Sequence, residues 1–330
     1  MMFTILLGEI MKDELRYPLV TGAGGFIGRS LIKYLIKNEL SDKVIAVDVP
    51  DCPGLTSFRE NTRVQIIESD LSFEKIRPQL FHEPSSIFML AAMNGTGRFY
   101  TNPWDVLVNS TLPTLHTINE FKDCCPIVYT SSSEVYASTV ETNHKLIPTD
   151  ESVKPSIGDI HNTRWSYATA KLLGEVALNS ASKQFGTRGV VIRYHNVYGP
   201  NMGIDHFVPD FIRKIKLNNF ELIGAHESRA FLYIDDAISG TIAALSKCTN
   251  EIPIYHLGSE EEFEIREAAK IILEEFGMDN HALINLPSRP GSVIRRKADI
   301  TKAKNELIWQ PKVNFRHGIR KIIEEENLLQ

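Results

Sequence analysis

Tyr167 and Lys171 stand four residues apart in the segment Ser-Tyr-Ala-Thr-Ala-Lys, at the start of a helical pattern. This spacing puts both side chains on one face of a helix. A nearby ammonium favours the phenolate and lowers the pKa of a tyrosine from its usual value of about 10. The pair can then take a proton from a hydroxyl while a hydride leaves the same carbon. An ordinary pair on a helix surface is the alternative, so the surroundings decide between them.

A cluster of hydroxyl side chains, Thr130 to Ser133, follows the apolar segment Ile127-Val128-Tyr129. A hydroxyl at the end of a strand can hold a substrate oxygen against the tyrosine. Such a cluster also forms turns, which is the alternative. Glu134 comes next and adds a carboxylate to this cluster.

The elements that would position these residues begin with a glycine-rich turn. Residues 18–28 read PLVTGAGGFIG, a short apolar strand that runs into Gly22, Gly25 and Gly28. In a dinucleotide-binding turn, the first glycine permits a tight bend, the second lets the backbone approach a pyrophosphate, and the third lets the next helix pack closely. Phe26 and Ile27 open that helix, whose free N–H groups bind the phosphates. The sequence therefore predicts a nucleotide-binding βαβ unit.

Asp48 ends the second apolar strand, twenty positions after Gly28. A carboxylate at this point accepts hydrogen bonds from the ribose hydroxyls of adenosine and repels a 2′-phosphate. No Arg or Lys follows until Arg59. The sequence therefore favours NAD over NADP, unless Asp48 only starts a turn with Pro50 and Pro53.

Strand and helix patterns alternate through the first two hundred residues, with strands expected near 18–21, 43–48, 64–67, 86–91, 126–131 and 189–194. This alternation predicts an α/β fold with a doubly wound parallel Rossmann sheet. We assign residues 1–200 to that domain, with 229–248 returning to it, and residues 201–330 to a smaller mixed α/β lobe for the substrate. Parallel sheets bind ligands beyond the carboxyl ends of their strands, so a cleft is expected between the lobes.

Length and composition fit a soluble enzyme with two lobes: 330 residues, 43% of them apolar. A net charge of −5 without a run of Lys or Arg argues against nucleic acid as a partner. The four cysteines lack metal-ligand spacing, so we expect no metal and a reducing cytoplasm. The first sixteen residues resemble neither a signal peptide nor a membrane span.

These motifs together resemble the extended short-chain dehydrogenase/reductases, NAD-dependent enzymes that modify nucleotide sugars. The resemblance runs through nearly the whole chain, in the family's order: TGAGGFIG, Asp70-Leu71, Leu90-Ala91-Ala92, Asn109, SSSEVY, YATAK, RYHNVYGP, LIGAHESRAFLYIDDA, YHLGS, RPG at 289–291 and ADITKAKNELIWQPK. It implies that Asp70 and Leu71 flank the adenine and that Leu90, Ala91, Ala92 and Asn109 line the cofactor cleft. It further assigns Ser132, Tyr167 and Lys171 to catalysis, with Glu134 added to this candidate catalytic set, and Asn196, Arg229 and Arg289 to the sugar nucleotide. A planar guanidinium suits phosphate binding, although these arginines are ordinary surface residues on the alternative reading.

The family begins with oxidation of a sugar hydroxyl, usually at carbon 4, and its subfamilies diverge afterwards. Dehydratases resembling this chain carry Thr-Asp-Glu where it has Ser132-Ser133-Glu134, so the acid for water elimination is missing. The UDP-glucuronate decarboxylases show Thr-Ser-Glu, the pattern closest to this one. The 4-epimerases usually lack a charged side chain at the position of Glu134. We take 4-epimerisation as the leading reaction, with decarboxylation, 4-oxidation and 4,6-dehydration as alternatives. A non-catalytic NAD-sensing protein is the second alternative, which the intact Tyr–Lys pair disfavours.

Several further predictions concern the substrate and the assembly. Ser133 faces the sugar, and Arg164, just before Ser166-Tyr167, meets a substrate carboxylate unless it is an ordinary helix residue. Residues 140–164 form a loop over the sugar site. His195, where the family often has Phe, is either packed or a hydrogen-bond donor to the sugar. Relatives commonly form homodimers through two helices, here 104–121 and 167–183.

Overall fold

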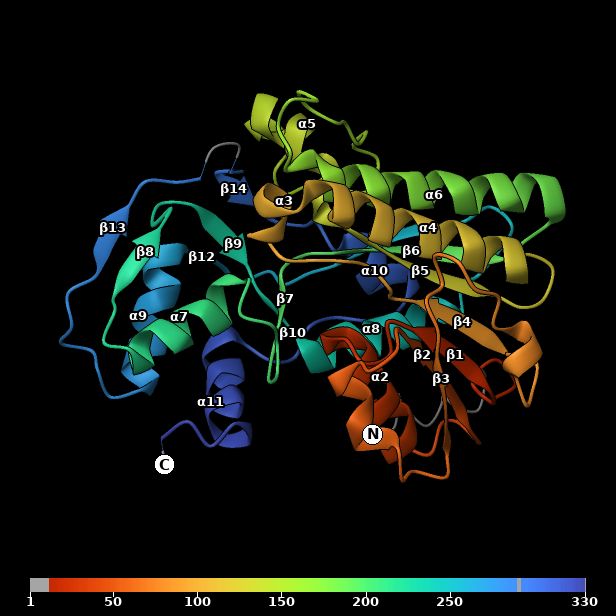
Figure 1. The fold of residues 1–330 in the computed structure, drawn as a ribbon. Coiled ribbons are helices and arrows are strands. Elements are labelled where there is room, and N and C mark those ends of the chain that lie inside the picture. The colour runs from red at the N-terminus through yellow and green to blue at the C-terminus, as the bar shows by residue number, and fades with distance from the viewer. Residues whose placement is uncertain (1–11, 290–291, 330) are drawn as a thin grey trace.

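The structure is a computed structural model that describes residues 12–289 and 292–329. Its centre is a parallel sheet of seven strands in the order β11-β6-β5-β4-β1-β2-β3 (Figure 1). The strands are β1 (Pro18–Thr21), β2 (Val44–Asp48), β3 (Val64–Glu68), β4 (Ser86–Met89), β5 (Ile127–Ser132), β6 (Gly189–Tyr194) and β11 (Ile254–Leu257). The predicted Rossmann sheet is confirmed, and β11 is a seventh strand that the strand pattern did not reveal.

Helices cover both faces of the sheet, as Figure 1 shows. The long helices α4 (Pro103–Phe121) and α6 (Trp165–Phe185) pack against each other over β5 and β6. On the opposite face α2 (Phe26–Lys37) packs beside α8 (Ile234–Leu245). Leu31 and Leu35 of α2 are fully buried, which agrees with the apolar spacing that predicted this helix.

The rest of the chain forms a second group of elements beyond the carboxyl ends of the strands. Its helices are α7 (Phe207–Lys216), α9 (Ile265–Glu275) and α11 (Phe315–Glu325), whereas α10 (Thr301–Glu306) packs on β11 of the main sheet. Its strands pair as β7 (Val197–Tyr198) with β10 (Leu232–Tyr233), β8 (Glu221–Ile223) with β13 (Ile284–Leu286), and β9 (Ser228–Ala230) with β12 (Glu262–Glu264) and β14 (Arg295–Arg296). The domain boundaries proposed from the sequence stay a prediction. No helix in the described ranges is long and apolar enough to cross a membrane.

Short elements connect the sheet to the site. The helix α3 (Arg98–Thr101) follows β4, and the 3₁₀ helix η3 (Ser133–Tyr136) leads from β5 into α5 (Ala137–Thr142). In the segment 140–164, Val153 and Ile157 pack against the apolar cluster that contains Trp165, and Arg164 lines the cavity described below. Burial of these apolar side chains holds part of the segment against η3 and α6, and its position over the sugar site stays a prediction.

Candidate active site

A cavity of about 670 Å³ opens where the strands of the main sheet end. The predicted residues that line it are Gly22, Gly25, Phe26, Ile27, Gly28, Leu90, Ala92, Ser132, Ser133, Glu134, Arg164, Tyr167, Lys171, Asn196, Arg229 and Arg289. These residues come from positions as far apart as 22 and 289. The fold therefore gathers most of the predicted site at one cleft.

Tyr167 and Lys171 lie at the start of α6 and are 7% and 2% exposed. The ammonium of Lys171 lies 5.7 Å from the centre of the Tyr167 ring and donates a hydrogen bond to the carbonyl oxygen of Thr130 at 2.8 Å. Burial raises the pKa of Tyr167, and the charge of Glu134 raises it further. This direction is opposite to the one predicted from the Tyr–Lys spacing, because loss of solvent around the phenol outweighs the lysine charge.

The pKa of Lys171 falls to about 8 because burial disfavours the ammonium, while the charge of Glu175 opposes that effect. Glu175 lies one helical turn after Lys171 and forms a buried ion pair with Arg193 across 2.5 Å. It also accepts a hydrogen bond from the hydroxyl of Ser131. Lys171 is therefore close to its titration point near neutral pH, which suits a residue that assists proton transfer.

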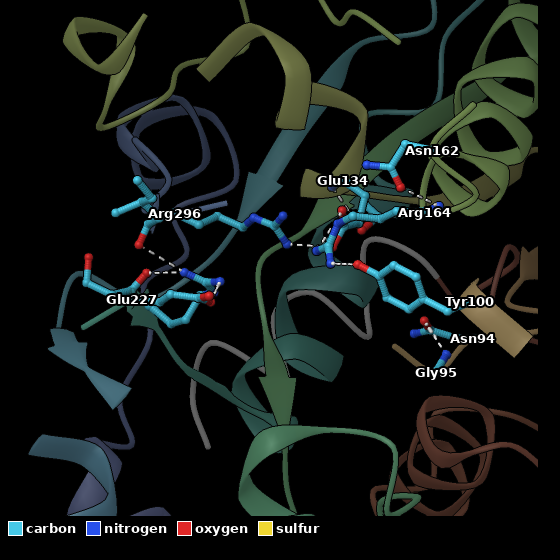
Figure 2. A network of polar contacts seen from close by, with 12 residues as sticks. Asn94, Gly95, Tyr100, Glu134, Asn162, Arg164, Glu227 and Arg296 are labelled. Carbon is cyan, nitrogen blue, oxygen red and sulfur yellow. Dashed lines mark hydrogen bonds and ion pairs between the residues drawn. The ribbon is translucent and has the colours of Figure 1, made fainter. Parts of the chain in front are cut away.

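Ser132 ends β5, and its hydroxyl oxygen accepts a hydrogen bond of 3.2 Å from the backbone N–H of Glu134. Glu134 accepts hydrogen bonds from Arg164 at 3.0 Å and from Arg296 at 2.8 Å (Figure 2). Burial opposes ionisation of Glu134, but the charges of Arg296 and Arg164 outweigh it and lower the pKa to about 2. Glu134 is therefore a carboxylate at any ordinary pH.

The guanidinium groups of Arg164 and Arg296 also carry N–H groups that do not bind Glu134. The Nε atoms of Arg164 and Arg296, and Nη2 of Arg296, are buried without a hydrogen-bond partner within the protein. Buried donors of this kind are normally satisfied, because leaving one unpaired costs about 1–3 kcal/mol. The arrangement of two cations around one carboxylate thus fits an additional anion in the cavity.

The sequence-predicted substrate residues differ in their partners. Arg229 forms an ion pair of 2.6 Å with Glu227 and donates to two backbone carbonyl oxygens. Burial and the nearby Arg296 charge lower the pKa of Arg229 to about 10. The amide of Asn196 donates to the carbonyl oxygen of Ala230 at 3.0 Å. Arg289 is exposed at the cavity.

The glycine-rich turn has the close contacts that a dinucleotide requires. Gly22 has a φ of 66°, and a Cβ there would lie 2.8 Å from the backbone nitrogen of Ala91. A Cβ on Gly28 would overlap the carbonyl oxygen of Gly22. Asp48 accepts hydrogen bonds of 2.8 Å from the backbone N–H groups of Gly24 and Val49, so it is fixed beside the turn.

Comparison with known proteins agrees with this geometry. Residues 18–258 match the model of the NAD dependent epimerase/dehydratase family. The chain belongs to this family. It is therefore an NAD-dependent enzyme of the nucleotide-sugar class, as the resemblance implied, and the alternative of a non-catalytic NAD sensor is not supported.

Relatives within the NAD dependent epimerase/dehydratase family differ in activity. UDP-glucuronic acid decarboxylase 1 of Arabidopsis thaliana is 27% identical over 93% of this chain and 69% of its own length. UDP-N-acetyl-alpha-D-glucosaminuronate decarboxylase of Bacillus cytotoxicus is 26% identical over 93% of this chain and 96% of its own length. The structure of UDP-glucuronic acid 4-epimerase from Bacillus cereus with UDP-glucuronic acid and NAD aligns with a TM-score of 0.81 at 26% identity, covering 94% of this chain and 99% of that one.

The glycine-rich turn, the start of α2 and Asp48 fit the NAD that this epimerase/dehydratase family uses. The glycine cradle and the first turn of α2 would hold the pyrophosphate, and Asp48 the adenosine ribose. Asp48, Asp70, Leu71, Ala91 and Asn109 are not among the described residues that line the cavity. Asp70 accepts a bond from Ser72 N–H, and the Leu71 carbonyl oxygen contacts the ring of His116. Their assignment to the cofactor stays a prediction.

Other residues were missed or left open by the sequence argument. Arg296 was missed, although it stands just before the ADITKAK motif and is 8% exposed. Glu227, Phe99 and Tyr100 also carried no recognisable spacing signal. His195 is 1% exposed, its ring lies 4.9 Å from that of His256, and burial lowers its pKa. It is a packed histidine, the first of the two readings, and is not among the described lining residues.

Proposed function

We propose that the enzyme oxidises carbon 4 of a nucleotide-linked uronic acid and then removes its carboxyl group as carbon dioxide. The observation that carries this proposal is the pair Arg164 and Arg296, which share Glu134 and retain unpaired buried N–H groups. Guanidinium forks bind carboxylates preferentially. A neutral hexose would leave these donors unsatisfied, whereas a uronate supplies the missing acceptor.

The first step assigns roles to three residues. Ser132 holds the oxygen on carbon 4, Lys171 stabilises Tyr167 as a phenolate, and this phenolate takes the proton of the hydroxyl and becomes a phenol. NAD supplies the hydride acceptor and later the hydride donor. The charge of Lys171 is needed at this step because burial otherwise disfavours the phenolate of Tyr167.

The second step follows from the product of the first. A ketone at carbon 4 makes the uronate a β-keto acid, so the bond between carbons 5 and 6 can break with its electron pair passing into an enolate. The hydroxyl groups of Ser132 and Tyr167 would stabilise the enolate oxygen. The ionised Glu134 would oppose a second negative charge beside it, which favours release of neutral carbon dioxide. A proton then adds at carbon 5 and a hydride returns to carbon 4.

Water elimination is less compatible with these residues. Ser133, which replaces the dehydratase aspartate, carries no acidic proton for a departing hydroxyl. Glu134 has a pKa of about 2 and is not protonated near neutral pH. Neither side chain therefore supplies the acid that dehydration requires.

The second candidate is 4-epimerisation of the same substrate, the leading reaction from the sequence. It is favoured by the likeness to the Bacillus cereus UDP-glucuronic acid 4-epimerase. Carbon dioxide leaves most easily when the breaking bond stands perpendicular to the ketone plane. If Arg164 and Arg296 hold the carboxylate in that plane, the ketone survives and the hydride returns to its other face.

The deciding experiment mixes purified protein with UDP-, GDP-, CDP- and dTDP-linked sugars and uronic acids without added NAD. Mass spectrometry of the products should show loss of carbon dioxide from a uronic acid. An unchanged mass with a new isomer would establish the epimerase instead. Turnover of neutral sugars alone would overturn the assignment of a uronic acid.

A further inference from the structure

Two adjacent residues of α3, Phe99 and Tyr100, contact two different residues near the start of α6. The connection from β4 to this short helix contributes Asn94, Thr96 and Gly97 to the cavity lining, together with residues 202–206. The sequence argument assigned no role to this segment. Its contacts involve the candidate base Tyr167 and the arginine that we propose to bind the substrate carboxylate.

Phe99 stacks on Tyr167. The ring centres are 5.2 Å apart and the planes differ by 16°. Phe99 is 3% exposed and belongs with Val106 and Tyr167 to an apolar cluster separate from the main cores. Since a stacked ring fixes the plane of its neighbour, Phe99 restricts the direction in which the Tyr167 hydroxyl can point.

Tyr100 approaches Arg164 from the same helix. Its hydroxyl oxygen accepts a hydrogen bond of 3.5 Å from Nη1 of Arg164, while Nη2 of that arginine binds Glu134, as Figure 2 shows. Tyr100 and Glu134 thus occupy the two terminal nitrogens of Arg164. Its buried Nε has no partner in the protein. This arrangement fixes the guanidinium plane.

Asp205 holds the segment that carries both aromatic residues. Its backbone oxygen accepts a hydrogen bond of 3.4 Å from Thr96 N–H, and its carboxylate lies 3.5 Å from Nε of Arg98. Gly95 has a φ of 136°, and a Cβ there would lie 2.8 Å from a carboxylate oxygen of Asp205. Contact between the two sides of the cavity therefore depends on a glycine at this position.

We propose that α3 is a positioning element in which Phe99 sets the geometry of the base Tyr167 and Tyr100 sets the geometry of Arg164. Phe99 then governs the rate of hydride transfer, and Tyr100 governs recognition of a carboxylate on the substrate. The second part rests on the proposed function, whereas the first requires only the oxidation step. Separate substitutions at neighbouring positions should consequently affect different kinetic quantities.

The first test is Phe99→Leu, which keeps an apolar side chain but removes the flat ring. We expect the rate of NAD reduction in a single turnover, followed by absorbance, to fall by about tenfold to 100-fold. The dissociation constant of the nucleotide sugar, NAD content and thermal midpoint should stay near those of the unsubstituted protein. Phe73→Leu, at a residue 78% exposed outside the site, is the matched control.

The second test is Tyr100→Phe, which removes one hydroxyl. We expect the dissociation constant of UDP-glucuronic acid, or of whichever uronic acid in the panel reacts, to rise by about threefold to tenfold. Binding of UDP-glucose and the rate at saturating uronic acid should not change. Tyr17→Phe, before β1 and far from the cavity, controls for loss of a hydroxyl.

The outcomes separate this inference from the proposed function. If no uronic acid reacts with the unsubstituted protein, the proposed function fails, and Phe99→Leu is tested with the sugar that does react. If Phe99→Leu transfers hydride at the normal rate, or loses rate only in proportion to lost NAD or lost fold, the positioning role of Phe99 is wrong. If Tyr100→Phe weakens the binding of UDP-glucose and of UDP-glucuronic acid equally, the role of Tyr100 in carboxylate recognition is wrong.

Discussion

Glu134 contacts two guanidinium groups, and this arrangement gives a single side chain both a structural and a chemical role. Its side chain is 12% exposed, and those of Arg164 and Arg296 are 6% and 9% exposed. Burying a charge is costly unless the charge is paired. Removing one partner of a buried ion pair therefore lowers the stability of the fold more than removing one partner of an exposed ion pair. The same carboxylate would lie beside the carboxyl group of a bound uronic acid.

The variant Glu134→Gln tests both roles. It leaves two buried cations without a counter-charge, so the free energy of unfolding should fall by about 2–4 kcal/mol. NAD reduction should persist while release of carbon dioxide slows at least tenfold, because the neighbouring negative charge is gone. Denaturant unfolding and quantification of carbon dioxide measure these effects. Glu262→Gln, which removes the partner of Arg295 outside the cavity, is the control; equal losses in both variants would contradict the assignment.

Lys171 makes the reaction sensitive to pH. Its pKa is lowered to about 8, chiefly by burial, so the ammonium is lost as pH rises through that value. We expect the rate of NAD reduction to decline above about pH 8, whereas Glu134 should contribute no change between pH 5 and 9 because it is already ionised. Single-turnover rates from pH 6 to 10 give the profile. A rate that stays constant to pH 10 would exclude Lys171 as the charged partner of Tyr167.

At the level of elements, local sequence patterns predicted the strands and helices whose formation depends on residues close together in the chain. Apolar runs and glycine spacing gave six strands of the sheet, and the Tyr167–Lys171 spacing gave a pair on one face of α6. Contacts between distant segments left no such periodic signal. Arg296 reaches Glu134 across 162 positions, and β11 joins β6 from beyond α8. These features depend on tertiary packing, which spacing within one segment does not encode.

The turn between β1 and α2 offers a test of an element. Gly28→Ala adds a Cβ that overlaps the Gly22 carbonyl oxygen, so α2 must move away from β1. We expect loss of most bound NAD and a cost of about 1–3 kcal/mol from overpacking, reduced by the better helix propensity of alanine. NAD released on denaturation and the thermal midpoint measure the two effects. Lys33→Ala, on the exposed side of α2, is the control. Normal NAD content in Gly28→Ala would contradict the assignment of the turn at Gly22–Gly28 to NAD binding.

At the level of the whole molecule, the cavity requires elements from both ends of the chain. Glycines of the β1–α2 turn lie on one side, and Arg289 and Arg296 on the other. The two parts pack through a shared core, since one apolar cluster includes both Leu31 of α2 and Ile319 of α11, and Trp309 donates to the Asp236 carbonyl oxygen. The face of α4 and α6 turned away from the sheet takes no part in this packing. The large apolar side chains exposed on these two helices are Trp104, Leu173, Val176 and Phe185, at 72%, 36%, 58% and 47%.

That face is where we propose that two copies of the chain meet. Leu173 and Val176 are three residues apart on α6, so they lie on the same side of the helix. Val176→Asp would place a charge in the apolar contact, and its burial on association is unfavourable. We expect the unsubstituted protein to be a dimer in light scattering at micromolar concentration and Val176→Asp to be a folded monomer that retains NAD. Phe73→Asp, at an exposed residue after β3, should remain dimeric. A monomeric unsubstituted protein would contradict the proposal, and a dimeric Val176→Asp variant would move the interface to another face.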